Sequence, residues 1–296
     1  MPLSQGHVMD ASGAVDWLAA SPLTTALFTD FDGTLSPIVS RPEDARSLPG
    51  VPALLKRLAA QMLVVAVASG RPAGWLLEHL ALASEPGGEA LTAAAGERVE
   101  AYGLHGLEHW IGSGIQVDDG ARAWQPLIAE ARSEAIAAGL VGVEVEDKRF
   151  SVTLHWRNAP DPIAAGALAM PLAERLGAST GLIARPGKSS VELVPPIGVD
   201  KGSVVRRRVE TSGARRVVFL GDDVSDVLAF LAIDDLVAGA GGGGAPIAGL
   251  KIAVTGEDAV PELTELADLV LDGPESAVAL LTELARHLEA GGSKHP

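Results

Sequence analysis

The stretch Asp30-Phe31-Asp32-Gly33-Thr34-Leu35 decides how this sequence is interpreted, and it directly follows a short apolar run at residues 26–29. If that run is a strand, the two carboxylates leave its carboxyl end together, and Gly33 allows the backbone to turn sharply. Two carboxylates this close repel each other unless they share a cation or a proton. A bare D-x-D-G pattern is equally compatible with a solvated acidic turn, so the rest of the chain has to decide.

Composition and charge limit the possible functions. The 296 residues are 47% hydrophobic, which is enough material for one large domain or two ordinary ones. A formal charge of −15 argues against nucleic acids and anionic membranes as partners. A phosphorylated substrate remains compatible, because a metal ion and a few local cations can reverse the field inside one cleft. The absence of cysteine excludes disulfides and thiolate zinc sites.

Targeting signals and membrane segments are not evident in the sequence. Residues 1–22 lack a basic start followed by an apolar region, and no apolar run approaches the ~20 residues needed to cross a bilayer. We therefore expect a soluble, cytoplasmic protein, with a monomer as the default. The glycine-rich stretch at 238–244 is expected to be a surface loop, and residues 291–296 a frayed tail.

Short apolar runs alternate with helical patterns over much of the chain. The runs at 26–29, 63–68 and 217–220 are interpreted as buried strands, and helices are expected at 51–61, 73–82 and 224–233. This alternation predicts an α/β fold with a parallel sheet covered on both faces. Each strand is followed by polar residues, which are Asp30 and Asp32, then Ser69-Gly70-Arg71, then Gly221-Asp222-Asp223. Ligands of such sheets bind at the carboxyl ends of the strands, so these residues are expected to meet at one edge.

The middle of the chain has a different pattern. Residues 150–157 alternate strictly between apolar and polar side chains, which predicts a half-buried strand, with 143–146 as its hairpin partner. Farther on, Lys188, Ser190 and Glu192 are expected to share one strand face. With helices at 121–138 and 164–176, this predicts an α+β domain at 111–195, inserted into a core of residues 1–110 and 196–296. Its polar sheet face is either available to a ligand or simply solvated.

The acidic strand ends suggest phosphoryl transfer. An aspartate can attack a phosphoryl group and form an acyl-phosphate, provided that a divalent cation offsets the repulsion between the two anions. We assign Asp30 as nucleophile and metal ligand, and Asp32 as the acid and base that also offers its backbone carbonyl to the metal. Asp222 would complete the metal shell, with Asp226 one turn later either supporting it or binding the metal through water. Mg²⁺ suits such oxygen ligands.

Ser69 and Lys201 complete the predicted catalytic set. Ser69 would offer its hydroxyl, and the neighbouring backbone N–H groups, to the phosphate. Lys201 follows Asp200, a good N-cap for the helix after it. A lysine in a first helical turn opposes the helix dipole, which suggests a charge-neutralising role. Taken alone, Lys201 would be interpreted as a surface lysine, but together with the other motif residues it is assigned to the site.

The order of these motifs resembles the haloacid-dehalogenase (HAD)-type phosphatase superfamily. Within it, the chain is similar to the trehalose-6-phosphate phosphatases. The segments that carry this closer similarity are residues 30–39, 69–71, 102–106, 151–157, 187–195, 200–202 and 221–226. The resemblance implies a Rossmann-like core with an inserted cap of the C2 type. It also implies dependence on Mg²⁺ and release of trehalose and inorganic phosphate from trehalose 6-phosphate.

The resemblance also implies which residues bind the substrate. Thr34, Gly70 and Arg71 are assigned to substrate binding in the core. Arg157, Lys188 and Glu192 are expected to bind the sugar from the cap. On a single strand Lys188 and Glu192 would lie about 13 Å apart, a span that suits a disaccharide phosphate. The alternative for Arg157 is a purely structural pair with Glu192.

Four positions depart from the usual pattern of the family: Phe31, Trp156, Val194 and Val227. Two other functions therefore stay open. One is a phosphatase of the same fold that acts on another sugar phosphate, and the other is a non-catalytic sugar-phosphate-binding module. Loss of Asp30 or Asp32 would be the sign of the second, and both are present. Hinges between core and cap are expected near residues 107–112 and 195–199.

Overall fold

The computed structural model describes residues 9–82, 99–239, 245–256 and 259–292, and the chain forms two compact units. The first unit comprises residues 1–39, 43–115 and 200–296, and the second comprises 40–42 and 116–199. The boundaries at 115/116 and 199/200 lie five and four residues beyond those expected from the sequence, at 110/111 and 195/196. Most of the glycine-rich stretch and of the C-terminal tail lies outside the described residues.

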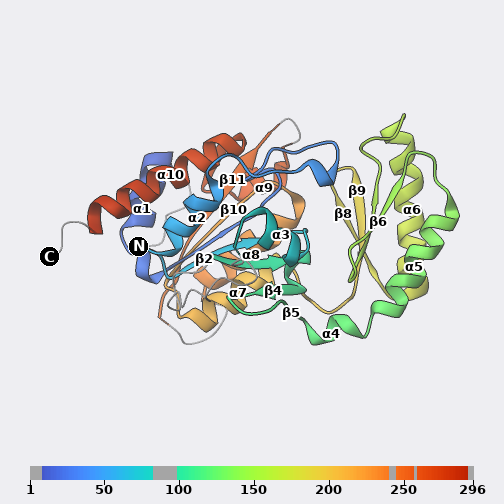
Figure 1. Ribbon diagram of the computed structural model, residues 1–296, viewed down its shortest axis with the longest axis horizontal. Coiled ribbons are helices and arrows are strands. Elements are labelled where there is room, and N and C mark those ends of the chain that lie inside the picture. Colours follow the sequence, from blue (N-terminus) through green and yellow to red (C-terminus); the bar gives the residue numbers. More distant parts are fainter. Residues whose placement is uncertain (1–8, 83–98, 240–244, 257–258, 293–296) are drawn as a thin grey trace. The chain divides into compact units, whose positions relative to one another are not determined.

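The first unit is built on a twisted, mostly parallel sheet (Figure 1). Within this unit the strand order is β12-β11-β10-β1-β2-β3-β4, and β4 alone runs antiparallel to its neighbour. The strands are β1 (Thr25–Thr29), β2 (Val64–Ala68), β3 (Val99–Gly103), β4 (Glu108–Trp110), β10 (Arg216–Gly221), β11 (Ala248–Thr255) and β12 (Leu269–Asp272). The order reverses between β1 and β10, which is the position where sheets of this type bind their ligands.

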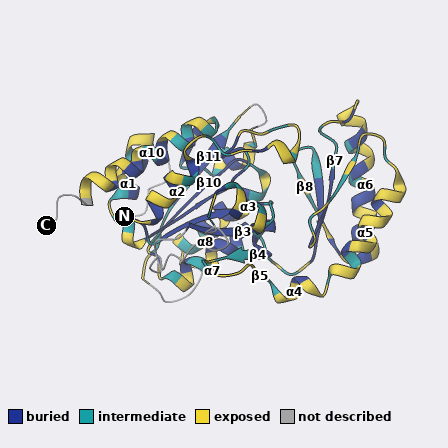
Figure 2. Ribbon diagram, in the orientation of Figure 1, coloured by how far each residue is buried: buried dark blue, intermediate teal, exposed yellow. Residues whose placement is uncertain are grey.

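Helices cover both faces of this sheet. One core cluster joins the sheet to α1 (Ala11–Ala19), α2 (Val51–Ala59), α3 (Ala73–His79) and α10 (Gly273–Gly292). The other joins it to α7 (Lys201–Ser212), α8 (Val224–Val237) and α9 (Pro261–Leu266). Within β1, Leu27 belongs to the first cluster, whereas Ala26 and Phe28 belong to the second. Because both faces are buried (Figure 2), the strands read as continuous apolar runs, and the predicted α/β class is confirmed.

The second unit contains an antiparallel sheet in the order β6-β7-β9-β8. Its strands are β6 (Glu144–Asp147), β7 (Val152–His155), β8 (Ile183–Gly187) and β9 (Ser190–Val194), and its helices are α4 (Asp119–Arg122), α5 (Gln125–Ala138) and α6 (Pro162–Thr180). A short strand, β5 (Gln116–Val117), precedes them. Alternate apolar residues of β7 and β9, together with α5 and α6, form the core of this unit. The expected hairpin is confirmed, with Val145 opposite Leu154.

Two predicted cap residues are not on strands. Lys188 lies in the tight turn between β8 and β9, where Gly187 pairs with Ser190. Ser189 takes a left-handed φ of 54° to close this turn. Arg157 lies in a turn after the end of β7. The predicted spacing of Lys188 and Glu192 along one strand is therefore wrong, because the alternation of polar residues continues through the hairpin turn and conceals it.

The other elements differ from the predictions mainly at their ends. The helix expected at 121–138 is broken into α4 and α5, and Pro126 lies in the first turn of α5, where proline favours a helix start. Both α6 and α8 extend four residues beyond the expected ends at 176 and 233, to Thr180 and Val237. In the described part of the chain, no helix is long and apolar enough to cross a membrane.

Candidate active site

Three neighbouring strands of the first unit deliver polar residues to one edge of the sheet. In the parallel register Thr29 of β1 pairs with Leu220 of β10 and with Val67 of β2. The residues that follow these strands are therefore close, and the N–H of Asp30 donates to the carbonyl of Leu220 at 2.8 Å. Asp30, Ser69 and Asp222 are all buried. Gly33 takes a left-handed φ of 75°, as the sharp turn after Asp32 requires.

Lys201 is a buried member of the site and not a surface lysine. Asp200 is the N-cap of α7 and accepts from the N–H of Ser203, so Lys201 is the first residue of the helix. Its Nζ lies 3.0 Å from Oδ1 of Asp30 and 2.6 Å from Oδ1 of Asp226, and only 1% of its side chain is exposed. Burial opposes its charge, but the carboxylates of Asp226 and Asp30 outweigh this and raise its pKa.

Asp226 organises the site from the first turn of α8. Its Oδ1 accepts from Lys201, and its Oδ2 accepts from the backbone N–H groups of Asp222 and Asp223, at 2.9 Å each. A side chain at Gly221 would overlap the Asp226 carboxylate, so glycine is required there. Asp226 therefore fixes both the loop that carries Asp222 and the ammonium of Lys201. This matches the supporting role expected from the sequence.

The carboxylates are arranged so that a cation could bind among them. One oxygen each from Asp30, Asp222 and Asp226 can be chosen so that all lie within 4.8 Å of one another. Among the described residues this group does not include the carboxylate of Asp32. Both oxygens of Asp226 already accept hydrogen bonds, so Asp30 and Asp222 stay the proposed direct ligands. A metal role for Asp32 is left to its backbone carbonyl and stays a prediction.

The donor set fits Mg²⁺. Three buried carboxylates face a single ammonium, so the cluster holds an excess of negative charge that a divalent cation would offset. Burial raises the pKa of Asp30 well above its ordinary value; Lys201 lowers it, and the neighbouring carboxylates, with Asp226 foremost, raise it further. Hard oxygen ligands are those that Mg²⁺ prefers. A side chain at Gly33 would overlap the carboxylate of Asp222, so glycine at this position lets that carboxylate approach the turn.

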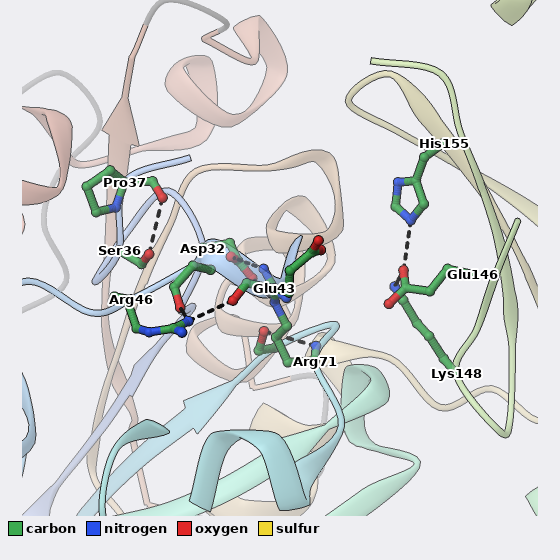
Figure 3. Close-up of polar contacts among 11 residues, drawn as sticks. Asp32, Ser36, Pro37, Glu43, Arg46, Arg71, Glu146, Lys148 and His155 are labelled. Carbon is green, nitrogen blue, oxygen red and sulfur yellow. Dashed lines mark hydrogen bonds and ion pairs between the residues drawn. The ribbon is translucent and has the colours of Figure 1, made fainter. Parts of the chain in front are cut away.

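Arg71 binds the second aspartate of the motif. Its Nε and Nη2 donate to the two oxygens of Asp32 at 2.8 and 2.7 Å (Figure 3), and its guanidinium lies 4.5 Å from the ring centroid of Trp75. Such a fork fixes both the position and the orientation of a carboxylate. From the sequence, Arg71 was assigned to the substrate, and its pair with Asp32 could not be predicted because the two residues are 39 positions apart.

Ser69 and Thr34 place hydroxyl groups in the same region. The N–H of Ser69 donates to the carbonyl of Tyr102, and its Oγ accepts from the N–H of Arg71 at 3.2 Å. Of the expected phosphate-binding amides, those of Ser69 and Arg71 are therefore engaged within the protein. Thr34 is fully buried, and its Oγ1 has no hydrogen-bond partner among the described residues. A buried hydroxyl without a partner needs an explanation, and a bound ligand is one.

The second unit carries its own polar cluster on β6, β7 and β9. Glu192 accepts from the hydroxyl of Ser151 at 2.5 Å and lies 3.6 Å from Nζ of Lys148. The Nε2 of His155 lies 2.8 Å from Glu146 (Figure 3). Burial works against the charge of Glu146, but His155 and Lys148 together lower its pKa. From the sequence, Glu192 was predicted to bind the sugar, but Lys148 and Glu146 were not assigned to the site. The dipeptide Asp147-Lys148 indicated only a hairpin turn.

Comparisons with known proteins agree with this arrangement. Residues 28–242 match the family model described as "Trehalose-phosphatase". The trehalose-phosphate phosphatase of Mycobacterium avium is 36% identical over 290 residues, which cover 95% of this chain and 66% of that protein. The chain thus spans just under two thirds of the length of that relative.

Solved structures show the fold. The C-terminal domain of the Candida albicans trehalose-6-phosphate phosphatase superposes with a TM-score of 0.74 at 21% identity, covering 95% of this chain and 98% of that one. A haloacid dehalogenase-like hydrolase from Bacteroides thetaiotaomicron gives 0.56 at 15% identity, covering 89% and 99%. The predicted HAD-like fold with a Rossmann-like core and an inserted α+β domain is confirmed. With its strand-end aspartates and its buried lysine, the chain belongs to the trehalose-phosphatase family.

Proposed function

We propose that this protein is a Mg²⁺-dependent phosphatase that hydrolyses trehalose 6-phosphate to trehalose and inorganic phosphate through an aspartyl-phosphate on Asp30. The observation that carries this proposal is the buried set of Asp30, Lys201, Asp222 and Asp226 at the point where the strand order reverses. A carboxylate at the carboxyl end of such a sheet can attack an anionic phosphate when a neighbouring lysine offsets the repulsion between the two negative charges.

Asp30 acts as the nucleophile. One of its oxygens attacks phosphorus, a new O–P bond forms, and the bond between phosphorus and the sugar oxygen breaks. Lys201 holds Oδ1 of Asp30 at 3.0 Å and offsets negative charge that would otherwise accumulate. Burial and neighbouring carboxylates raise the pKa of Asp30, so cations are needed to keep it ionised. When bound, Mg²⁺ supplies further charge neutralisation for the carboxylate and the phosphate.

Asp32 moves the protons. It protonates the leaving sugar oxygen as the P–O bond breaks, and it later removes a proton from the water that attacks the aspartyl-phosphate. Its two-point contact with Arg71 orients the ionised carboxylate that removes the proton from water. For the first step, one of the two contacts is given up so that this oxygen carries the proton for the sugar oxygen. The phosphate group is proposed to bind beside Thr34, because the buried Oγ1 of Thr34 can donate a hydrogen bond to a phosphate oxygen. Ser69 and Gly70 are proposed to contact the same group.

The cluster on the second unit is proposed to bind the sugar. Glu192 can accept hydrogen bonds from sugar hydroxyls, and the ammonium of Lys148 can donate to them. Both are anchored within the unit, since Glu192 is held by Ser151 and lies close to Lys148. Arg157 and Lys188, in turns after β7 and β8, remain proposed as further sugar contacts. This division of labour leaves the chemistry to the first unit and the choice of sugar to the second.

A panel of sugar phosphates tests the proposal. Phosphate release should be measured with Mg²⁺ for trehalose 6-phosphate, sucrose 6-phosphate, glucose 6-phosphate and mannosylglycerate phosphate. We expect kcat/KM to be highest for trehalose 6-phosphate. A higher value for another ester would overturn the substrate and keep the mechanism, whereas no release from any ester would favour the non-catalytic module. Removal of Mg²⁺ with a chelator should abolish release, and its readdition should restore it.

A further inference from the structure

Two segments of the first unit are bound to each other beside the site. The first, residues 69–73, follows β2 and is called the Ser69 loop. The second, residues 102–108, joins β3 to β4 and is called the clamp segment. Four hydrogen bonds of 2.9 Å connect them: Ser69 N–H to Tyr102 O, Leu104 N–H to Arg71 O, His105 N–H to Ser69 O, and Ala73 N–H to Oε2 of Glu108. Bonds in both directions fix the Ser69 loop along its whole length.

Two glycines let the segments approach this closely. A side chain at Gly103 would overlap the backbone N of Ala73, although the φ of Gly103 is an ordinary −93°. A Cβ at Gly70 would lie 3.1 Å from both Cε1 and Nε2 of His105. The imidazole of His105 therefore packs directly against Gly70, the second residue of the Ser69 loop. Gly103 is required because of space, and a side chain at Gly70 would crowd the imidazole; neither position depends on a left-handed backbone.

The clamp segment adopts a strained backbone at its centre. Leu104 and His105 take left-handed φ values of 49° and 56°, and they are consecutive residues other than glycine. Such conformations are costly and persist only where the surrounding structure enforces them. They are also the two residues whose N–H groups bind the carbonyls of Arg71 and Ser69. The strain is thus located where the clamp segment binds the Ser69 loop.

We propose that His105 is a positioning residue for phosphoryl transfer, which rests on the function proposed above. Its imidazole supports Gly70, and its backbone N–H holds the carbonyl of Ser69. Together these contacts fix the hydroxyl of Ser69 and the start of the Arg71 side chain. Since Arg71 orients Asp32 through two hydrogen bonds, a displaced loop also displaces the proton donor. His105 acts through the loop and needs no contact with the substrate.

Kinetics of four variants test the role of His105. We expect His105→Ala to lower kcat for trehalose 6-phosphate at least about tenfold, because small misplacements near reacting groups are costly. His105→Asn should recover at least about a third of the lost activity, since asparagine tolerates the left-handed backbone. Gly70→Ala should also lose activity, because its methyl group would crowd the imidazole. In Gly70→Ala/His105→Ala the methyl group has space, so the combined loss should be smaller than the product of the two single losses.

The control is His287→Ala on the exposed face of α10, which should match the wild type in both activity and thermal unfolding. Wild-type kcat in His105→Ala, or single losses that simply multiply in the double variant, would overturn the proposal.

Hydrogen exchange tests the role of the clamp segment independently of the proposed function. In His105→Ala the amides of the Ser69 loop should exchange at least about tenfold faster, whereas those of β10 should keep their wild-type rates. Equal acceleration throughout the first unit would indicate general destabilisation and overturn the proposal, as would an unchanged Ser69 loop. A wild-type protein that releases no phosphate would remove the proposed function, and the exchange pattern would still decide whether His105 fixes the loop.

Discussion

The two units each place carboxylates beside cations, but in different surroundings. In the first unit Lys201, Asp30 and Asp226 have side chains that are at most 7% exposed. In the second, the exposed fraction of the side chain rises from 11% and 13% at Glu192 and Lys148 to about 30% at Glu146 and His155. Charges without water are held rigidly and interact strongly, whereas charges that keep water contribute little net energy and adapt to a ligand. The contrast agrees with chemistry in the first unit and recognition in the second.

The largest effect on stability is expected when Lys201 is removed from the buried cluster. Lys201→Met leaves the carboxylates of Asp30 and Asp226 buried without their ammonium, which should cost about 3–5 kcal/mol in the free energy of unfolding. Activity should be lost as well. Urea unfolding should be compared with that of Lys56→Met, an exposed lysine of α2 that donates to the carbonyl of Ala81. If Lys201→Met lowers the free energy of unfolding by less than about 1 kcal/mol, Lys201 contributes no more than an exposed ion pair does. The two units would then not differ in the strength of their ion pairs.

A smaller and different effect is expected from the second unit. Glu192→Gln keeps the size of the side chain but removes its charge, so KM for trehalose 6-phosphate should rise about tenfold, equivalent to ~1.4 kcal/mol of lost binding. The value of kcat should stay within about threefold, since the nucleophile is untouched. Glu144→Gln, an exposed residue of β6 in the same unit, is the matched control. If kcat falls while KM is unchanged, Glu192 does not act in ground-state sugar binding.

The smallest effect concerns the pH dependence of stability. The folded-state pKa of Glu146 lies below its ordinary value of 4.5. Its ionised form therefore adds stability that is present above about pH 4.5 and is lost as the pH falls through the lowered folded value. With the side chain a third exposed, we expect less than about 1 kcal/mol. The difference in unfolding free energy between wild type and Glu146→Gln should shrink from pH 6 to pH 3. A difference that grows on acidification would contradict the sign of this shift.

The sequence predicted the strand-end residues because local patterns carry them. Continuous apolar runs marked β1, β2 and β10, and the rule that parallel strands end at one edge then brought Asp30, Ser69 and Asp222 together. Lys201 could be predicted from its unfavourable place in a first helical turn. Its double contact with Asp30 and Asp226 could not, because it depends on how α7 packs against α8.

What the sequence could not predict depends on long-range packing. The fork between Arg71 and Asp32 joins residues that each suggested a different role. Lys188 and Arg157 were predicted to lie on strands because the alternation of apolar and polar residues continues from the strands into the turns. The clamp segment was noticed only as part of a family motif. Its role depends on the left-handed backbone at Leu104 and His105. Histidine is enriched in that conformation, but no local signal predicts it for two consecutive residues of which one is leucine.

Whether Asp30 is the nucleophile can be decided by measuring phosphate release by Asp30→Asn. Because asparagine keeps the shape and relieves repulsion among the buried carboxylates, the variant should fold with unchanged or higher thermal stability in the absence of Mg²⁺. Its release of phosphate from trehalose 6-phosphate with Mg²⁺ should fall at least about 10³-fold, whereas Asp16→Asn on the exposed face of α1 should behave as wild type. A folded Asp30→Asn variant with activity within tenfold of wild type would show that Asp30 is not the nucleophile.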